Sequence, residues 1–207
     1  SLIKNMNFCS NYTAFKFNLI KKDCSSILFD GCRFMDCVTA IDMSNESTMT
    51  TFHKCHFLHC PTIYKTVSSD QTLFDDCWFS EYQHAENGAT SFILSWGETI
   101  FKNCFFIPNG NYKQFDQNQY TGLAWIEMNN NTKLTIDNCR ISGETNNKTI
   151  VNFKGAFNVQ SPNNSGISIR NSSNLTCGLG ETLIRLYSMP NFINIDECSP
   201  FTEEEKL

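Results

Sequence analysis

A short motif of apolar and polar positions recurs along most of the chain. Each copy begins with Phe or Ile, continues with two mostly polar residues, and then has Cys, one variable residue and a second Phe or Ile. Clear copies occupy residues 27–34, 51–57, 73–79, 100–106 and 135–141, and weaker ones occupy residues 169–172 and 195–198. A motif that repeats every few tens of residues is typical of solenoid proteins. The pattern therefore predicts one small structural unit stacked many times.

The spacing inside each copy predicts two strands joined by a bend. Successive side chains of a strand point to opposite faces, so Cys and the apolar residue two positions later share the inner face. The three-residue step from the first apolar residue to Cys breaks this alternation unless two residues form a corner. In five of seven copies the second corner residue is Gly, Asp or Asn, which adopt a left-handed backbone most easily: Gly31, Asp76, Asn103, Asn138 and Asn171.

A third strand per repeat is predicted at residues 40–43, 62–65, 123–126 and 183–186. Three short strands in 22 or 23 residues form one coil, and equivalent positions of successive coils stack in rows. Counting back from Cys32 by this step reaches Cys9, which is expected to be the Cys of a degraded first copy of the motif. A second, partial row is expected at Cys37, Cys60 and Cys177. We therefore expect an all-β fold, a parallel β-helix solenoid of about seven to eight coils of three short strands each.

With these motifs the chain resembles the right-handed parallel β-helices of the pectin-lyase-like superfamily. The Phe-x-x-Cys-x-Phe repeats are more narrowly similar to surface proteins of trichomonad parasites and to bacterial polymorphic outer-membrane proteins. The resemblance implies a right-handed coil, in agreement with the general handedness of parallel connections. It implies little about function, because lyases, hydrolases, phage tailspikes and adhesins share this architecture.

Composition narrows the class of protein. The chain has 207 residues, of which 41% are apolar and 18% charged, and its net charge is −5. This suits a single domain over residues 1–198, followed by an acidic tail at residues 199–207. The acidic balance argues against nucleic-acid binding, and no apolar run reaches the length of about 18 residues that a membrane span needs. The start lacks Met and a signal-like segment, so we expect a piece of a longer precursor.

The eleven cysteines are expected to be small buried side chains that stack from coil to coil, rather than disulfides or metal ligands. No Cys-x-x-Cys motif occurs, and the odd number leaves at least one free thiol. The densest candidate for a metal site is the cluster of His53, Cys55, His56, His59 and Cys60. Because Cys55 faces inward and His56 outward, these two cannot share one metal ion, and we expect no metal and no cofactor.

Seven Asn-x-Ser/Thr sequences are glycosylation candidates, at Asn11, Asn45, Asn130, Asn147, Asn163, Asn171 and Asn174. They favour an extracellular or cell-surface location.

Candidate binding residues lie on the outer side of the predicted coils. The position after each Cys carries aromatic and basic residues: Arg33, His56, Trp78, Phe105 and Arg140. Some coils are longer than 22 or 23 residues, and the surplus falls in residues 83–90, 107–122 and 153–166. The second of these inserted segments contains Tyr112, Phe115 and Tyr120. Inserted loops of solenoids frequently form the binding face. These aromatics either bind a ligand or fold back over the sheet.

The corner positions carry charged residues: Asp30, His53, Asp75, Lys102, Asp137, Arg170 and Asp196. These residues either form a row that binds a substrate, or they are turn residues whose alternating charges relieve repulsion between stacked corners. The signature motifs of polygalacturonases and pectate lyases are absent from the sequence.

Three functions remain open. We favour a non-catalytic extracellular domain that recognises a carbohydrate or protein ligand in adhesion. The alternatives are a polysaccharide lyase or hydrolase, and a structural spacer or filament unit with end-to-end self-association.

Overall fold

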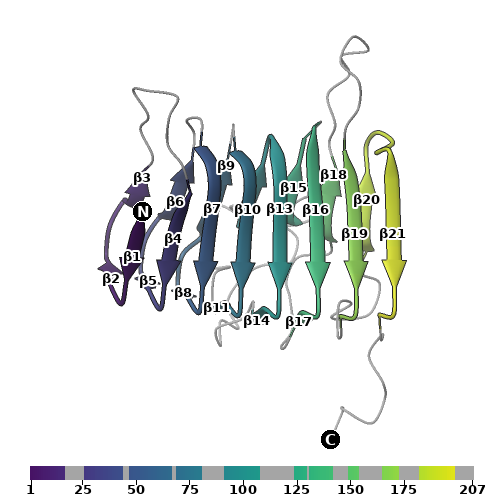
Figure 1. Cartoon of the computed structure of the whole chain (residues 1–207). Coiled ribbons are helices and arrows are strands. Elements are labelled where there is room, and N and C mark those ends of the chain that lie inside the picture. Colours follow the sequence, from purple (N-terminus) through teal and green to yellow (C-terminus); the bar gives the residue numbers. More distant parts are fainter. Residues whose placement is uncertain are drawn as a thin grey trace, which may run out of the picture.

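The fold is built from parallel β-strands that wind into a solenoid (Figure 1). In the computed structural model the described residues are 1–16, 26–43, 47–66, 69–80, 91–107, 124–129, 131–141, 149–153, 165–172 and 182–198. All regular elements among them are strands, so the predicted all-β parallel solenoid is confirmed. The predicted acidic tail at 199–207 lies outside the described residues.

Three sheets run along the solenoid axis, and each successive coil adds a strand to them. Sheet A contains, in spatial order, β1 (Leu2–Lys4), β4 (Ile27–Asp30), β7 (Ser47–His53), β10 (Ser69–Asp75), β13 (Gly97–Lys102), β16 (Thr132–Asp137), β19 (Gly166–Arg170) and β21 (Phe192–Asp196). Sheet B contains β2 (Asn7–Cys9), β5 (Arg33–Met35), β8 (His56–Leu58), β11 (Trp78–Ser80), β14 (Phe105–Ile107) and β17 (Arg140–Ile141). Sheet C contains β3 (Thr13–Lys16), β6 (Thr39–Met43), β9 (Thr62–Thr66), β12 (Phe92–Leu94), β15 (Ala124–Met128), β18 (Thr149–Phe153) and β20 (Thr182–Leu186).

The corner between sheets A and B has the left-handed residue that the sequence predicts. Its φ is between 50° and 64° at the five predicted positions, which are Gly31, Asp76, Asn103, Asn138 and Asn171. Lys54 and Glu197 also adopt it, at 51° and 49°, although their side chains disfavour it. The amide of Lys54 donates to the carbonyl of Asp75 in the next coil at 3.0 Å, as Gly31 does to His53 at 2.9 Å. Hydrogen bonds between coils therefore fix the corner whichever residue occupies it.

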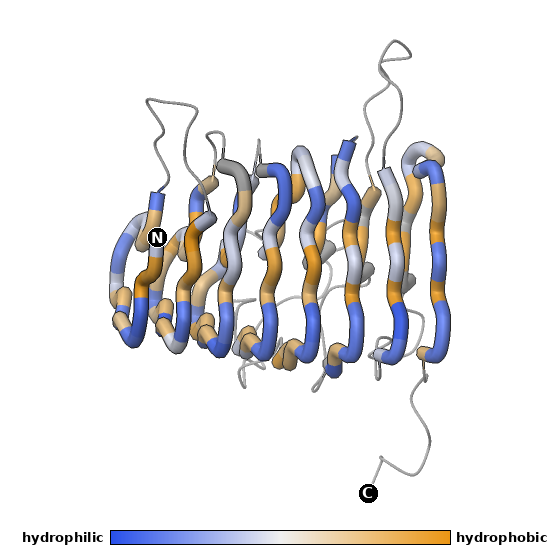
Figure 2. Tube along the Cα trace, viewed as in Figure 1, coloured by the Kyte–Doolittle hydropathy of each residue, from blue (hydrophilic) through white to orange (hydrophobic). Residues whose placement is uncertain are grey.

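Two rows of phenylalanine fill the core. In sheet A the stacked rings of Phe29 and Phe52 have centroids 4.8 Å apart, and in sheet B those of Phe34 and Phe57 are also 4.8 Å apart. The two rows meet edge to face, as between Phe52 and Phe57 at 5.9 Å. Stacked and T-shaped pairs at these separations are favourable ring geometries. Figure 2 shows apolar bands at corresponding places in successive strands of sheet A.

The first coil differs from the prediction. Phe8 is paired with Phe34, and Asn5 supplies the left-handed corner with φ 53°. The residue at the Cys position of this coil is therefore Met6, and the expectation that Cys9 occupies it is wrong. Cys9 lies opposite Met35 and is exposed. The first coil is longer than the next two, so counting back by a constant step gave the wrong residue.

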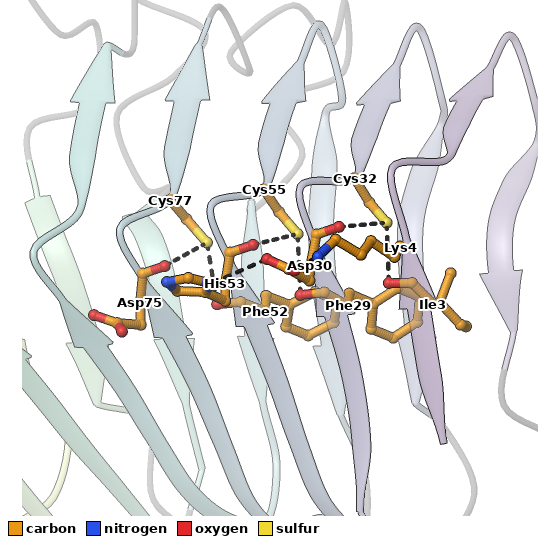
Figure 3. Close-up of polar contacts among 10 residues, drawn as sticks. All are labelled: Ile3, Lys4, Phe29, Asp30, Cys32, Phe52, His53, Cys55, Asp75 and Cys77. Atoms are coloured by element: carbon orange, nitrogen blue, oxygen red, sulfur yellow. Dashed lines mark hydrogen bonds and ion pairs between the residues drawn. The ribbon is translucent and has the colours of Figure 1, made fainter.

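The thiols of Cys32, Cys55 and Cys77 each lie near two backbone carbonyls at the corner (Figure 3). The Cys55 thiol lies 3.5 Å from the carbonyl oxygen of Phe29 in the preceding coil and 3.4 Å from that of His53 in its own. Ser172 occupies the Cys position of its coil; its hydroxyl donates to the Arg170 carbonyl at 2.8 Å and accepts the Cys139 amide at 3.1 Å. In the coils that carry Cys or Ser here, the side chain is small and has one donor proton.

The described cysteines are all free thiols, as the sequence analysis predicts. The second row is confirmed for Cys37 and Cys60, which are buried and donate to the carbonyls of Met35 and Leu58 at 3.2 and 3.3 Å. Cys177 lies outside the described residues. Burial raises the pKa of the Cys60 thiol from 9.0 to about 12, and it also raises the pKa of Cys32 and of Cys77.

We predict that alkaline pH destabilises the protein partly through Cys60. Between about pH 9 and pH 12 the folded state keeps the Cys60 proton that the unfolded state loses, so raising the pH favours unfolding. One such thiol contributes a slope of about 1.4 kcal/mol per pH unit. Urea denaturation of the natural protein and of Cys60→Ala between pH 7 and pH 11 measures the slope. The variant should show a shallower decline above pH 9, and equal slopes would contradict the assignment.

Candidate functional site

One row of sheet B gathers three of the predicted site residues on the outside of the solenoid. Strand register places Arg33 opposite His56, His56 opposite Trp78, Trp78 opposite Phe105, and Phe105 opposite Arg140. We call these five residues the aromatic–arginine row. Neighbouring strands lie about 4.8 Å apart, so the row extends for about 19 Å along the axis.

Strand alternation explains why this row faces outward. Phe34, Phe57 and Phe79 each follow a residue of the row and are fully buried, so the preceding side chain points away from the core. Trp78 is 50% exposed. Arg33 and Arg140 are exposed, and His56 and Phe105 are half-buried.

The aromatic members contact one another. The ring centroids of Trp78 and Phe105 are 5.3 Å apart with planes tilted by 53°, and those of His56 and Trp78 are 6.3 Å apart in an edge arrangement. His56 Nε2 lies 3.1 Å from the hydroxyl of Ser80, a hydrogen bond that fixes the ring. Burial and the positive charge of Arg33 lower the pKa of His56, so the ring is neutral near pH 7. The row thus presents a neutral aromatic centre with a guanidinium at each end.

A second outward row of sheet B, which the sequence analysis did not single out, borders the first. It aligns Met35 with Leu58, Leu58 with Ser80, and Ser80 with Ile107. Met35, Leu58 and Ile107 are half-buried. The strand alternation that identified the aromatic–arginine row would have found these residues two positions further along. Together the two rows make the outer face of sheet B largely apolar.

The corner of sheet A carries a separate row, which we call the charge row. Register aligns one residue from each strand: Lys4, Asp30, His53, Asp75, Lys102, Asp137, Arg170 and Asp196. Basic and acidic residues alternate along its whole length. Asp30 lies 3.1 Å from Lys4 Nζ and 3.0 Å from His53 Nδ1 (Figure 3), and Asp137 lies 2.9 Å from Arg170.

Two carboxyls of the charge row, those of Asp30 and Asp137, fit a structural role. Hydrogen bonds from His53 and Lys4 lower the pKa of Asp30. Burial raises the pKa of Asp137, but hydrogen bonds from Asn171 and Arg170 outweigh this and lower it overall. A general acid needs the opposite shift, toward a pKa near the working pH. These pairs favour the interpretation that alternating signs relieve repulsion between stacked corners.

The histidine-rich cluster of the sequence is divided between different corners. His53 pairs with Asp30, whereas His59 Nδ1 lies 3.1 Å from Asp36. Across the residues that the structure describes, no group of three or more His, Cys, Asp or Glu side chains is arranged as metal ligands.

The remaining predicted site residues are placed only in part. Tyr112, Phe115 and Tyr120 lie outside the described residues. Asn11 is exposed and its side chain donates to the Cys9 carbonyl at 3.0 Å, whereas Asn171 donates to Asp137 at the corner at 3.1 Å. The other glycosylation candidates also lie outside the described residues: Asn45, Asn130, Asn147, Asn163 and Asn174.

Comparisons with known proteins assign no family. No protein-family model matches the chain, and no curated protein matches it significantly. Within the described part of the chain, no helix has the length and apolar character that crossing a bilayer requires.

Proposed function

We propose that this protein is a non-catalytic recognition domain whose ligand lies along the outer face of sheet B. The observation that carries the proposal is the register that sets Trp78 beside Phe105, between Arg33 and Arg140. A half-exposed Trp on a rigid parallel sheet provides a preformed flat surface, and Trp and Arg are the residues most enriched where binding energy concentrates.

A carbohydrate suits this surface better than a protein. Aromatic faces hold the apolar faces of sugar rings, and guanidinium groups form paired hydrogen bonds with carboxylate groups. The spacing of about 4.8 Å between neighbouring residues of the row allows one extended chain to contact several of them. Protein ligands remain the alternative, with Met35 and Leu58 as additional apolar contacts.

The proposed setting is the cell surface or the extracellular space, in adhesion. The exposed sequence at Asn11 supports a glycoprotein, and the repeat motif supports kinship with the pectin-lyase-like β-helices. Residues Tyr112, Phe115 and Tyr120 are proposed as additional contacts from the inserted segment. A structural spacer is the second candidate, favoured by the regular stacking of parallel strands along one axis in all three sheets.

We predict that Trp78→Ala weakens binding at least about tenfold, equivalent to about 1.4 kcal/mol, to whichever polysaccharide binds from a panel of acidic and neutral ones. Trp96→Ala is the matched control, because Trp96 is 48% exposed but lies outside the row. Affinity is measured by calorimetry on both variants after thermal unfolding has confirmed that they are folded. Equal losses in the two variants, or no loss for Trp78→Ala, would contradict the proposed site.

A further inference from the structure

The outer face of sheet A is a broad surface, because this sheet has the largest number of strands of the three (Figure 1). Eight strands about 4.8 Å apart, each about five residues long, cover about 600 Å². Two such faces in contact would bury about 1,200 Å², which reaches the range of stable protein interfaces. The face is therefore large enough to hold a partner protein.

The middle of this face carries an outward row that reads alike in both directions. Register aligns Thr51 with Leu73, Leu73 with Ile100, and Ile100 with Thr135. All four are half-buried, and they alternate along their strands with core residues such as Phe74. Laid on this row in the reversed direction, the same row of a second copy would set Leu73 against Ile100 and Thr51 against Thr135. An apolar pair would then lie between two threonine pairs.

The charge row lies on the same face, two residues further along each strand, and it is complementary to its own reverse. Its eight members alternate in sign, so the reversed row presents the opposite sign at each position. The resulting pairs between two copies are Asp75 with Lys102, His53 with Asp137, Asp30 with Arg170, and Lys4 with Asp196. Two rows laid in the same direction would instead set like charges together.

The two central members of the charge row have no ion-pair partner in their own copy. Asp75 and Lys102 lie opposite each other in register, yet neither makes an ion pair within 4.0 Å among the described residues. The Asp75 carboxylate accepts a hydrogen bond from Asn103 Nδ2 at 3.1 Å, and Lys102 is exposed. By contrast, Asp30 and Asp137 have cations beside them. The centre of the row therefore keeps one charge of each sign for a partner.

We propose that two copies of this protein associate through the outer faces of sheet A, around a two-fold axis that runs along the strands between β10 and β13. This axis reverses the solenoid direction of one copy, so that Asp75 of each copy meets Lys102 of the other. Strands of stacked sheets lie within about 30° of each other, and the pairs nearest the axis are therefore aligned best. Contact between identical patches closes after two copies. The proposal is independent of the ligand surface on sheet B.

Sedimentation of the full chain at increasing concentration and low salt tests the proposal. The average mass should rise with concentration and level off at that of a dimer. Asp75→Lys and Lys102→Asp should each weaken association at least tenfold, because the two-fold axis turns one substitution into two repulsive contacts. Lys65→Asp is the matched control, since Lys65 lies on β9 of sheet C, and it should leave the dimer unchanged.

An equimolar mixture of Asp75→Lys and Lys102→Asp provides an arm that misfolding cannot imitate. Each variant restores the opposite charge in the other, so the mixture should form the dimer that neither variant forms alone. A monomer up to millimolar concentration, a mass that rises beyond two copies, or a mixture that stays monomeric would overturn the proposal. Loss of the dimer with Lys102→Asp but not with Asp75→Lys would also overturn it, because the two residues would then not face each other.

Discussion

Replacing Phe79 by Ala is expected to lower the free energy of unfolding by about 3–5 kcal/mol. The Phe79 side chain is fully buried, with ring centroids of Phe57 and Phe106 at 5.2 and 4.9 Å above and below it. The rings of Phe74 and Phe92 meet it edge to face at 5.6 and 5.3 Å. These neighbours belong to strands fixed by hydrogen bonds between coils, so the cavity cannot close by collapse. Chemical denaturation of the variant measures the loss.

The matched comparison uses two adjacent residues of β14. Phe106→Ala should lose nearly as much stability as the Phe79 variant, because Phe106 is also buried in the core row. Phe105→Ala should lose well under that, because Phe105 is half-buried on the outer face, where Trp78 is its ring contact. Equal losses at Phe105 and Phe106 would mean that the assignment of inner and outer faces is wrong.

The sequence allowed the coil to be predicted because one motif contains both the bend and the two inward rows. A regular strand cannot turn both Phe29 and Cys32 inward, because residues three positions apart lie on opposite faces. This spacing therefore located the corner. The first coil could not be aligned in the same way, because Met6 stands at the Cys position. Phe8, two residues further on, was the better guide, since the large ring stacks on Phe34 at 4.8 Å.

The candidate site was predictable to the extent that strand alternation controls it. Arg33, Trp78 and Arg140 came together as expected because they share a position in successive coils. The bordering row of Met35, Leu58 and Ile107 was not predicted, because each of these residues lies three positions after Cys, just beyond the repeated motif. Residues in the inserted segments have no repeat partner, so no register relates them to the sheet.

The recurrence of cysteine has a physical reason that the sequence pattern did not reveal. A purely apolar residue such as Ala at the Cys position would fill the space, but the corner carbonyls would lose the weak hydrogen-bond donor that the thiol provides. Cys77 donates toward the carbonyls of Phe52 and Asp75 at 3.3 and 3.5 Å, and Ser172 makes the equivalent contact with a hydroxyl. The thiol therefore combines small volume, apolar surface and one donor proton.

This role predicts very slow thiol labelling in the folded protein. Cys55, Cys77 and Cys104 are at most 2% exposed, so a reagent reaches them only when the coil opens. Because small domains open fully at a cost of at least about 5 kcal/mol, the native rates should be lower than the denatured rates by a factor of about 10³ or more. Cys9, which is exposed, is the internal control and should react at nearly the same rate in both states. Site-resolved mass spectrometry after a timed reaction with a maleimide, with and without urea, measures these rates. Native labelling of the three core thiols at the rate of Cys9 would show that they are accessible and that the thiol row does not close the corner.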